Sequence, residues 1–278
     1  MFSREKAWRA RLREALGRIH GLSLAYRMRD LWRSTAYIGR VTQSGEDGLP
    51  LPSPDLIQLV AGTPETAWFM RSGERAAESI RNALARHGVD LDSMQSILDF
   101  GCGCGRVVRH WRRLPARIYG SDANRRLIDW CRRNLPFAAF ATNSDRPPLS
   151  YREGQFDLVY ALSVFTHLPD DMQRPWMAEL HRVTRSGGYV LLSIHGDRYL
   201  PDLTADERRK FVAGELVVRG ADAAGRNECG AYHPAAYVQG VLAAGFDLID
   251  HVPEGATGNP PQDLVLLRKL PLSPVPDV

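Results

Sequence analysis

Residues 97–105, Ile-Leu-Asp-Phe-Gly-Cys-Gly-Cys-Gly, hold the residue types in this chain best suited to binding a small ligand. A short apolar run reaches Asp99, and glycines follow at positions 101, 103 and 105. Glycine has no Cβ, so a turn of this kind lets the backbone approach a ligand closely. Residues 106–111 have a helix-like pattern, and the N–H groups at a helix start favour a polar or anionic ligand group. We therefore expect a strand, a glycine turn and a helix beside a bound ligand.

The spacing of these glycines excludes two familiar ligand motifs. A dinucleotide fingerprint, G-x-G-x-x-G, would need glycine at position 106 or 108, where Arg106 and Val108 stand. No G-x-x-x-x-G-K-[ST] phosphate loop occurs in the chain. The pattern that remains is D-x-G-x-G-x-G after a strand.

Asp122 ends a second short apolar segment, residues 117–122. A carboxylate at the tip of a strand can accept two hydrogen bonds from a ribose diol. The alternative is that Asp122 caps the helix that we expect over residues 124–134, because Asp is a favoured N-cap. The two roles are compatible, and beside the glycine motif we favour ribose binding.

The rest of the chain alternates strands and helices. Residues 156–165 form a nearly continuous apolar run, as expected for a parallel strand covered on both faces. A helix over 170–185, a strand over 189–194, a helix over 234–244 and two strands over 245–252 and 263–268 follow. This order predicts an α/β fold with a doubly wound sheet.

The glycine motif and the acid after the second strand together resemble class I S-adenosylmethionine-dependent methyltransferases, over roughly residues 70–270. The resemblance implies a Rossmann-like seven-stranded sheet with an antiparallel last strand, here with an N-terminal helical extension. It implies S-adenosyl-L-methionine as the cofactor, with Arg106 facing the cofactor carboxylate or lying on a helix surface, and Asn143 facing the adenine amino group in place of the usual acid. The cofactor-binding residues that we predict are Asp99, Gly101, Cys102, Gly103, Gly105, Arg106, Asp122, Ala123, Asn143, Ser144, Ala161, Leu162 and Ser163.

Two histidines are the predicted catalytic residues. His167 lies just past the fourth strand, at the sheet edge where open α/β folds bind ligands, and a near-neutral pKa suits histidine to act as a base. His233 precedes the last helix and is the second candidate, with His195 behind it. The alternative is that these histidines order loops or cap helices. Trp68 and Phe69 either pack in the core or cover the cofactor pocket.

The basic charge of the chain is concentrated at its N-terminus. Residues 1–40 carry ten Lys or Arg against three acids, a net charge of +7, whereas the whole chain carries +4. Apolar residues fall on one helical face of this arm. We interpret it as a helix that packs on the core or a second subunit, or that meets an acidic carrier protein or an anionic membrane surface. Nucleic acid is a less favoured partner, because the rest of the chain sums to −3.

Composition bounds the domain organisation and the compartment. No apolar run approaches the roughly 20 residues of a membrane span, no signal peptide is visible, and four cysteines do not suggest a disulfide scaffold. We expect a cytoplasmic protein, with Cys102 and Cys104 as small turn residues and no metal site. The expected parts are a basic arm and linker (1–70), a methyltransferase domain (71–270) with a substrate-side insertion (196–233), and a tail (271–278).

The function that we predict is methyl transfer to a small-molecule acceptor, namely a hydroxyl of a sugar, lipid-linked or carrier-linked metabolite. The amino-acid sequences of the motifs at 99–106 and 163–168 resemble those of bacterial methyltransferases of polysaccharide or natural-product pathways. One alternative is an RNA or protein methyltransferase that uses the basic arm, although residues 163–166 lack the N/D-P-P-Y/F signature of amino-directed nucleic-acid enzymes. The other is a binding module that holds the cofactor without turnover.

Overall fold

The computed structural model describes residues 44–270, and the expectations for the N-terminal arm and the tail lie outside this range. Its centre is a seven-stranded sheet in the order β3-β2-β1-β4-β5-β9-β8. The strands are β1 (Ser96–Phe100), β2 (Arg117–Asp122), β3 (Ala138–Thr142), β4 (Phe156–Ala161), β5 (Thr184–Ile194), β8 (Phe246–Val252) and β9 (Asp263–Lys269). The pairings β1–β2, β1–β4, β2–β3 and β4–β5 are parallel, whereas β9 runs antiparallel to both β5 and β8. The predicted Rossmann-like sheet with an antiparallel last strand is confirmed.

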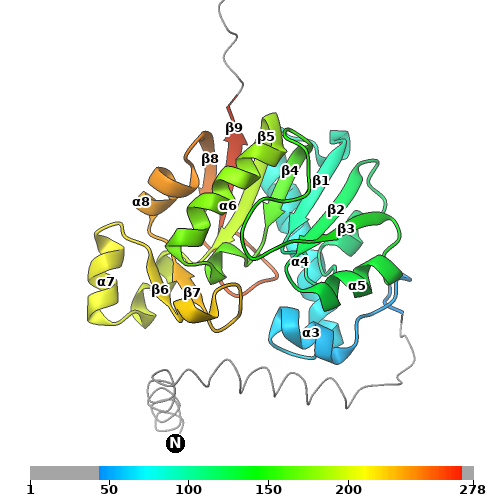
Figure 1. Cartoon of the computed structure of the whole chain (residues 1–278), viewed down its shortest axis with the longest axis horizontal. Coiled ribbons are helices and arrows are strands. Elements are labelled where there is room, and N and C mark those ends of the chain that lie inside the picture. The colour runs from blue at the N-terminus through cyan, green and yellow to red at the C-terminus, as the bar shows by residue number, and fades with distance from the viewer. Residues whose placement is uncertain (1–43, 271–278) are drawn as a thin grey trace, which may run out of the picture. The chain divides into compact units, whose positions relative to one another are not determined.

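Helices cover both faces of this sheet. They include α3 (Pro54–Ala61), α4 (Thr66–Ala85), α5 (Arg125–Asn134), α6 (Asp170–Val183) and α8 (Ala235–Tyr237). Consecutive β1 residues point to opposite faces, so Ile97 packs with α4 and α5, and Leu98 packs with α6 and α8. In Figure 1, α6 crosses the front of the sheet and α4 lies behind it. The sheet is therefore doubly wound, as predicted.

Two predicted helices differ from the structure. Residues 106–111 do not form an α-helix after the glycine turn; only a short 3₁₀-helix, η2 (Val108–Trp111), forms there. Gly105 has a left-handed φ of 76°, so the turn continues through it and delays helical backbone. Near the C-terminus, α8 has a single turn and passes into a π-helical segment, η6 (Val238–Leu242).

The predicted insertion at 196–233 contains elements of its own. They are the 3₁₀-helix η4 (Asp197–Asp202), α7 (Ala205–Val212), η5 (Ala221–Ala223) and a hairpin of β6 (Val217–Arg219) with β7 (Gly230–Tyr232). A capping box begins α7, because Thr204 Oγ1 accepts from the Glu207 N–H and the Glu207 carboxylate accepts from the Thr204 N–H. The domain boundary placed after residue 70 stays a prediction; α4 runs across that position.

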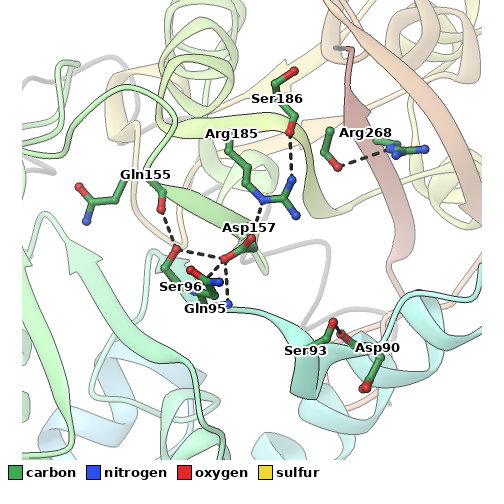
Figure 2. A network of polar contacts seen from close by, with 10 residues as sticks. Asp90, Ser93, Gln95, Ser96, Gln155, Asp157, Arg185, Ser186 and Arg268 are labelled. Carbon is green, nitrogen blue, oxygen red and sulfur yellow. Dashed lines mark hydrogen bonds and ion pairs between the residues drawn. The ribbon is translucent and has the colours of Figure 1, made fainter.

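Asp157 fastens the amino-terminal ends of three strands, opposite the glycine turn (Figure 2). Its Oδ2 accepts from the backbone N–H groups of Gln95 (2.9 Å) and Ser96 (2.8 Å), and its Oδ1 accepts from Nε of Arg185 on β5. Burial opposes ionisation of Asp157, but these hydrogen bonds outweigh it and lower its pKa. The network holds β1, β4 and β5 in register from the end of the sheet that carries no predicted site residue.

Candidate active site

A cavity of about 490 Å³ opens at the carboxyl ends of the parallel strands. This volume is in the range that drug-sized ligands occupy. Most of the predicted site residues line it: Asp99, Gly101, Cys102, Gly103, Arg106, Asp122, Ala123, Asn143, Ser144, Leu162, Ser163 and His167. Three do not, namely Gly105, Ala161 and His233. Trp68 also lines the cavity, whereas Phe69 is fully buried in the core.

The glycine turn has a conformation that only glycine adopts easily. Gly101 has a φ of 81°, and a Cβ there would lie 2.3 Å from Cγ2 of Val164 in the loop after β4. The N–H groups of Gly101 and Cys102 both donate to the carbonyl oxygen of Ser121 on β2, at 2.7 and 3.0 Å. These two hydrogen bonds hold the turn against the end of β2, and Gly101 and Gly103 line the cavity.

Asp122 links this turn to the end of β2. One carboxylate oxygen accepts from the Gly103 N–H at 2.9 Å and the other accepts from the Asn124 N–H at 2.7 Å. Burial raises the pKa of Asp122, and the two backbone hydrogen bonds oppose that rise. Each oxygen keeps lone pairs for a ligand hydroxyl. The N-cap of α5 is Asn124, whose Oδ1 accepts from the Arg126 N–H at 3.0 Å, so the alternative role of Asp122 as the cap of this helix is wrong.

Asp99 is a buried carboxyl group at the end of β1. Burial raises its pKa to about 7, although a hydrogen bond with the Tyr160 hydroxyl acts in the other direction. The same hydroxyl accepts from Trp111 Nε1 at 2.8 Å. Asp99 therefore has a pKa close to neutral pH. Its hydrogen bond with Tyr160 holds the carboxyl in place on the cavity wall.

The segment after β3 supplies polar groups to the other end of the cavity. Oδ1 of Asn143, which we expected to face an adenine amino group, accepts from the Ser121 hydroxyl at 2.6 Å, and Nδ2 donates to the Ser144 carbonyl at 2.8 Å. Asp145 also lines the cavity here and is exposed. A carboxylate two residues beyond Asn143 is therefore a second acceptor for an amino group, one that we did not single out from the sequence.

A network behind the β4 loop was not predicted. Ser163 is a non-glycine residue with a φ of 58°, and its N–H donates to the Ser193 hydroxyl at 2.7 Å. The hydroxyls of Ser163 and Ser193 both donate to Oε1 of Gln262, at 2.9 and 2.7 Å. Gln262 lies in the loop between β8 and β9 and lines the cavity. The network fixes a strained loop, of the kind often found at functional sites.

His167 lines the cavity, and a hydrogen bond fixes the tautomer of its ring. Its ring Nδ1 lies 2.7 Å from the carbonyl oxygen of Cys229 in the insertion. A carbonyl only accepts, so Nδ1 carries the proton and Nε2 keeps its lone pair in the neutral ring. Burial lowers the pKa of His167, while the Cys229 carbonyl opposes this. The Gly225 N–H also donates to the His167 carbonyl at 2.8 Å, so the insertion holds both ring and backbone.

His195, at the end of β5, is arranged in the same way. Its Nδ1 lies 3.1 Å from the Ala231 carbonyl, which leaves Nε2 unprotonated in the neutral ring. Burial, together with nearby His167, lowers its pKa to about 4. It lines the cavity with His167, so two neutral imidazoles stand on one wall.

His233 does not reach this cavity, which corrects our assignment of it as a catalytic residue. The ring is fully buried, and its Nε2 lies 3.2 Å from Oε1 of Gln173 on α6. Tyr232 stacks on His195, and side chains alternate along an extended strand, so His233 points to the opposite side. Burial, followed by the effect of His195, lowers its pKa to about 3. His233 is a neutral core residue.

Comparison with known proteins agrees with this fold. Residues 98–192 match the family described as methyltransferase domain. Methyltransferase GfsG of Streptomyces halstedii is 27% identical over 129 residues, which cover 44% of each chain. A malonyl-[acyl-carrier protein] O-methyltransferase of Hamiltonella defensa is 30% identical over 97 residues, 35% of this chain and 36% of that protein. The chain thus spans less than half the length of these curated relatives.

Solved structures support the fold. An S-adenosylmethionine-dependent methyltransferase from Methanosarcina mazei superimposes with a TM-score of 0.51 at 19% identity, covering 68% of this chain and 98% of that one. Residues 98–192 therefore match a methyltransferase domain, and the described residues have the class I methyltransferase fold, in agreement with the resemblance of the glycine motif. S-adenosylmethionine is the methyl donor that this match supports. Between residues 44 and 270, no helix combines the length and apolar character needed to cross a membrane.

Proposed function

We propose that the protein transfers a methyl group from S-adenosylmethionine to a hydroxyl of a small-molecule acceptor, such as a sugar, lipid-linked or carrier-linked metabolite. The observation that carries this proposal is that one cavity is lined both by Asp122, an acid suited to bind a ribose diol, and by His167, whose neutral ring has an unprotonated Nε2. The name of the Hamiltonella defensa relative, which describes O-methylation of a carrier-bound acyl group, supports an oxygen acceptor.

The residues present fit the cofactor by chemistry. Asp122 offers carboxylate lone pairs for a ribose diol, and Arg106 is a buried guanidinium on the cavity wall. Asn143 and Asp145 offer oxygen acceptors beyond β3. The glycine turn leaves room for a ligand beside its backbone. Once bound, S-adenosylmethionine supplies an activated methyl group on a sulfonium sulfur.

The protein then has to orient the acceptor and remove its proton. In this proposal, Nε2 of His167 takes the hydroxyl proton, since the Cys229 carbonyl keeps the proton of the neutral ring on Nδ1. In the same proposal, Nε2 of His195 orients the acceptor by accepting a hydrogen bond from a second donor group of that molecule, not from the reacting hydroxyl. Holding the oxygen in line with the methyl group accounts for much of the rate enhancement in reactions of this type.

The direct test is transfer of radiolabelled methyl from S-adenosylmethionine to a panel of sugars, lipid-linked sugars and acyl-carrier-protein thioesters. The expected product carries the labelled methyl group on oxygen, in a bond that is stable to mild acid. An acceptor analogue that lacks the hydroxyl should not give this product. Label recovered only in RNA or protein side chains would replace the small-molecule proposal. Tight S-adenosylhomocysteine binding without transfer to any acceptor would favour a binding module.

A further inference from the structure

The loop between β8 and β9 approaches the glycine motif from the far end of the chain. Thr257 Oγ1 donates to the Arg75 carbonyl on α4 at 2.9 Å. Gly258 has a φ of 81°, and a Cβ there would lie 2.2 Å from the Ser72 carbonyl oxygen. The loop backbone is therefore seated directly on α4, and its position next to the cavity is fixed.

This loop holds the guanidinium of Arg106. Nη1 donates to the Gly258 carbonyl (3.2 Å) and the Ser72 hydroxyl (3.3 Å), and Nη2 donates to Oδ1 of Asn259 (2.6 Å). All three acceptors are neutral, and Arg106 forms no ion pair with another residue between 44 and 270. Arg106 is only 8% exposed, and burial lowers its pKa. The nearby Asp99 carboxyl opposes this shift from beyond ion-pair distance, and burial raises the pKa of Asp99 itself to about 7. A buried guanidinium is costly unless an anion meets it directly.

The side chain of Asn259 is fixed by the same contact. Arginine has donors only, so the Asn259 oxygen must face Arg106 and its Nδ2 must face away. Nδ2 is shielded from water and has no acceptor among the described residues. Of the five N–H donors of Arg106, these contacts use three. The pair therefore positions a cation on the cavity wall with donors still to be satisfied.

We propose that the β8–β9 loop builds the carboxylate-binding end of the cofactor site, in which Arg106 binds the carboxylate of the S-adenosylmethionine amino-acid part and Asn259 is the positioning residue for Arg106. This inference rests on the proposed function. It makes a segment more than 150 residues beyond the glycine motif part of cofactor recognition.

The test is the Asn259→Asp variant, which keeps the shape of the side chain but gives Arg106 a carboxylate partner inside the protein. Calorimetry would compare S-adenosylhomocysteine with its decarboxylated analogue, which keeps the amino group and lacks only the carboxylate. We expect the variant to bind S-adenosylhomocysteine about tenfold more weakly or worse, because the new ion pair competes for Arg106. Binding of the analogue should change by less than about twofold.

Control variants separate positioning from packing. Asn227→Asp adds the same charge to another residue that lines the cavity, one that forms no hydrogen bond with Arg106, and should leave the ratio of the two affinities unchanged. Asn259→Ala, which removes the contact without adding charge, should shift the ratio in the same direction by a smaller factor. It also serves as the test if the aspartate variant does not fold.

The outcomes distinguish this inference from the proposed function. If Asn259→Asp weakened the binding of both ligands equally, or of neither, the role of the loop would be overturned. The proposal that the wild-type protein binds the cofactor would stand. Wild-type protein that binds neither ligand would overturn the proposed function and this inference with it.

Discussion

The backbone N–H of Gly103 donates to the Asp122 carboxylate at 2.9 Å, so the turn after β1 and the acid after β2 form one unit. The hydrogen bond joins the two features that carried the sequence prediction. A change at Asp122 should therefore alter the conformation of the glycine turn as well as any contact to a ribose.

Asp122→Asn should weaken S-adenosylhomocysteine binding by about 10- to 100-fold. The asparagine has one acceptor oxygen, whereas the N–H groups of Gly103 and Asn124 need two, and a lost hydrogen bond to a charged group costs about 1.5–3 kcal/mol. Titration calorimetry measures the change. Asp129→Asn, on the exposed side of α5, is the control and should bind as wild type does. If Asp122→Asn bound S-adenosylhomocysteine with the wild-type affinity, the assignment of Asp122 to the cofactor site would be wrong.

Gly101→Ala should destabilise the protein more than Gly88→Ala. Both glycines have left-handed φ values, 81° and 69°, so alanine is strained at each. A Cβ at Gly101 would also meet Val164 at 2.3 Å, whereas a Cβ at Gly88 would meet nothing within 4 Å. We expect losses of about 1 kcal/mol for Gly88→Ala and on the order of 3 kcal/mol for Gly101→Ala.

Denaturant unfolding with both variants tests this difference. Ligand binding should be lost only in Gly101→Ala. Equal destabilisation would mean that the loop after β4 yields freely, and that the turn is not clamped between the strand ends.

His167→Gln should lower kcat about 10²- to 10⁴-fold, the usual contribution of a general base. The base must be unprotonated, and burial lowers the pKa of His167 below its ordinary value near 6.5. The wild-type kcat should therefore stay level from pH 8 to about 6.5 and fall only at more acidic pH.

The pH profile of methyl transfer checks this assignment. The acidic limb should disappear in His167→Gln and persist in His87→Gln, a histidine that pairs with Asp250 away from the cavity. An acidic limb centred above pH 7 in the wild type would point to another base.

His233 should make the protein sensitive to acid. It must stay neutral in the folded state, where its pKa is about 3, but it protonates near pH 6.5 when unfolded. Its contribution to stability is therefore complete above pH 6.5 and is lost as the pH falls towards 3. Between pH 6.5 and 5 this loss amounts to about 2 kcal/mol.

The measurement is the unfolding free energy of wild type and His233→Asn at several pH values. The asparagine variant should lose less stability on acidification, whatever its stability at neutral pH. Parallel curves for the two proteins would show that His233 does not titrate on unfolding.

The sequence predicted the parts of this molecule that local patterns encode. Apolar runs and helical spacing located the strands and most helices, and the glycine and acid positions located the cavity. The Asn259–Arg106 contact and the Gln262 network could not be predicted, because they join segments far apart in the chain and depend on how the β8–β9 loop lies on α4. His233 was misplaced because a one-residue difference along a strand reverses the direction of a side chain.

The two hydrogen bonds between the insertion and His167 bear on attempts to re-engineer this protein. Cys229 sets which ring nitrogen holds the proton, and Gly225 fixes the backbone of the same residue. A graft that replaced residues 196–233 to alter acceptor choice would carry away the element that keeps His167 in its reactive tautomer. With His167 as the base that we propose, acceptor choice and reactivity would not be separable, and a successful chimera would have to bring a carbonyl partner for His167 with its new loop.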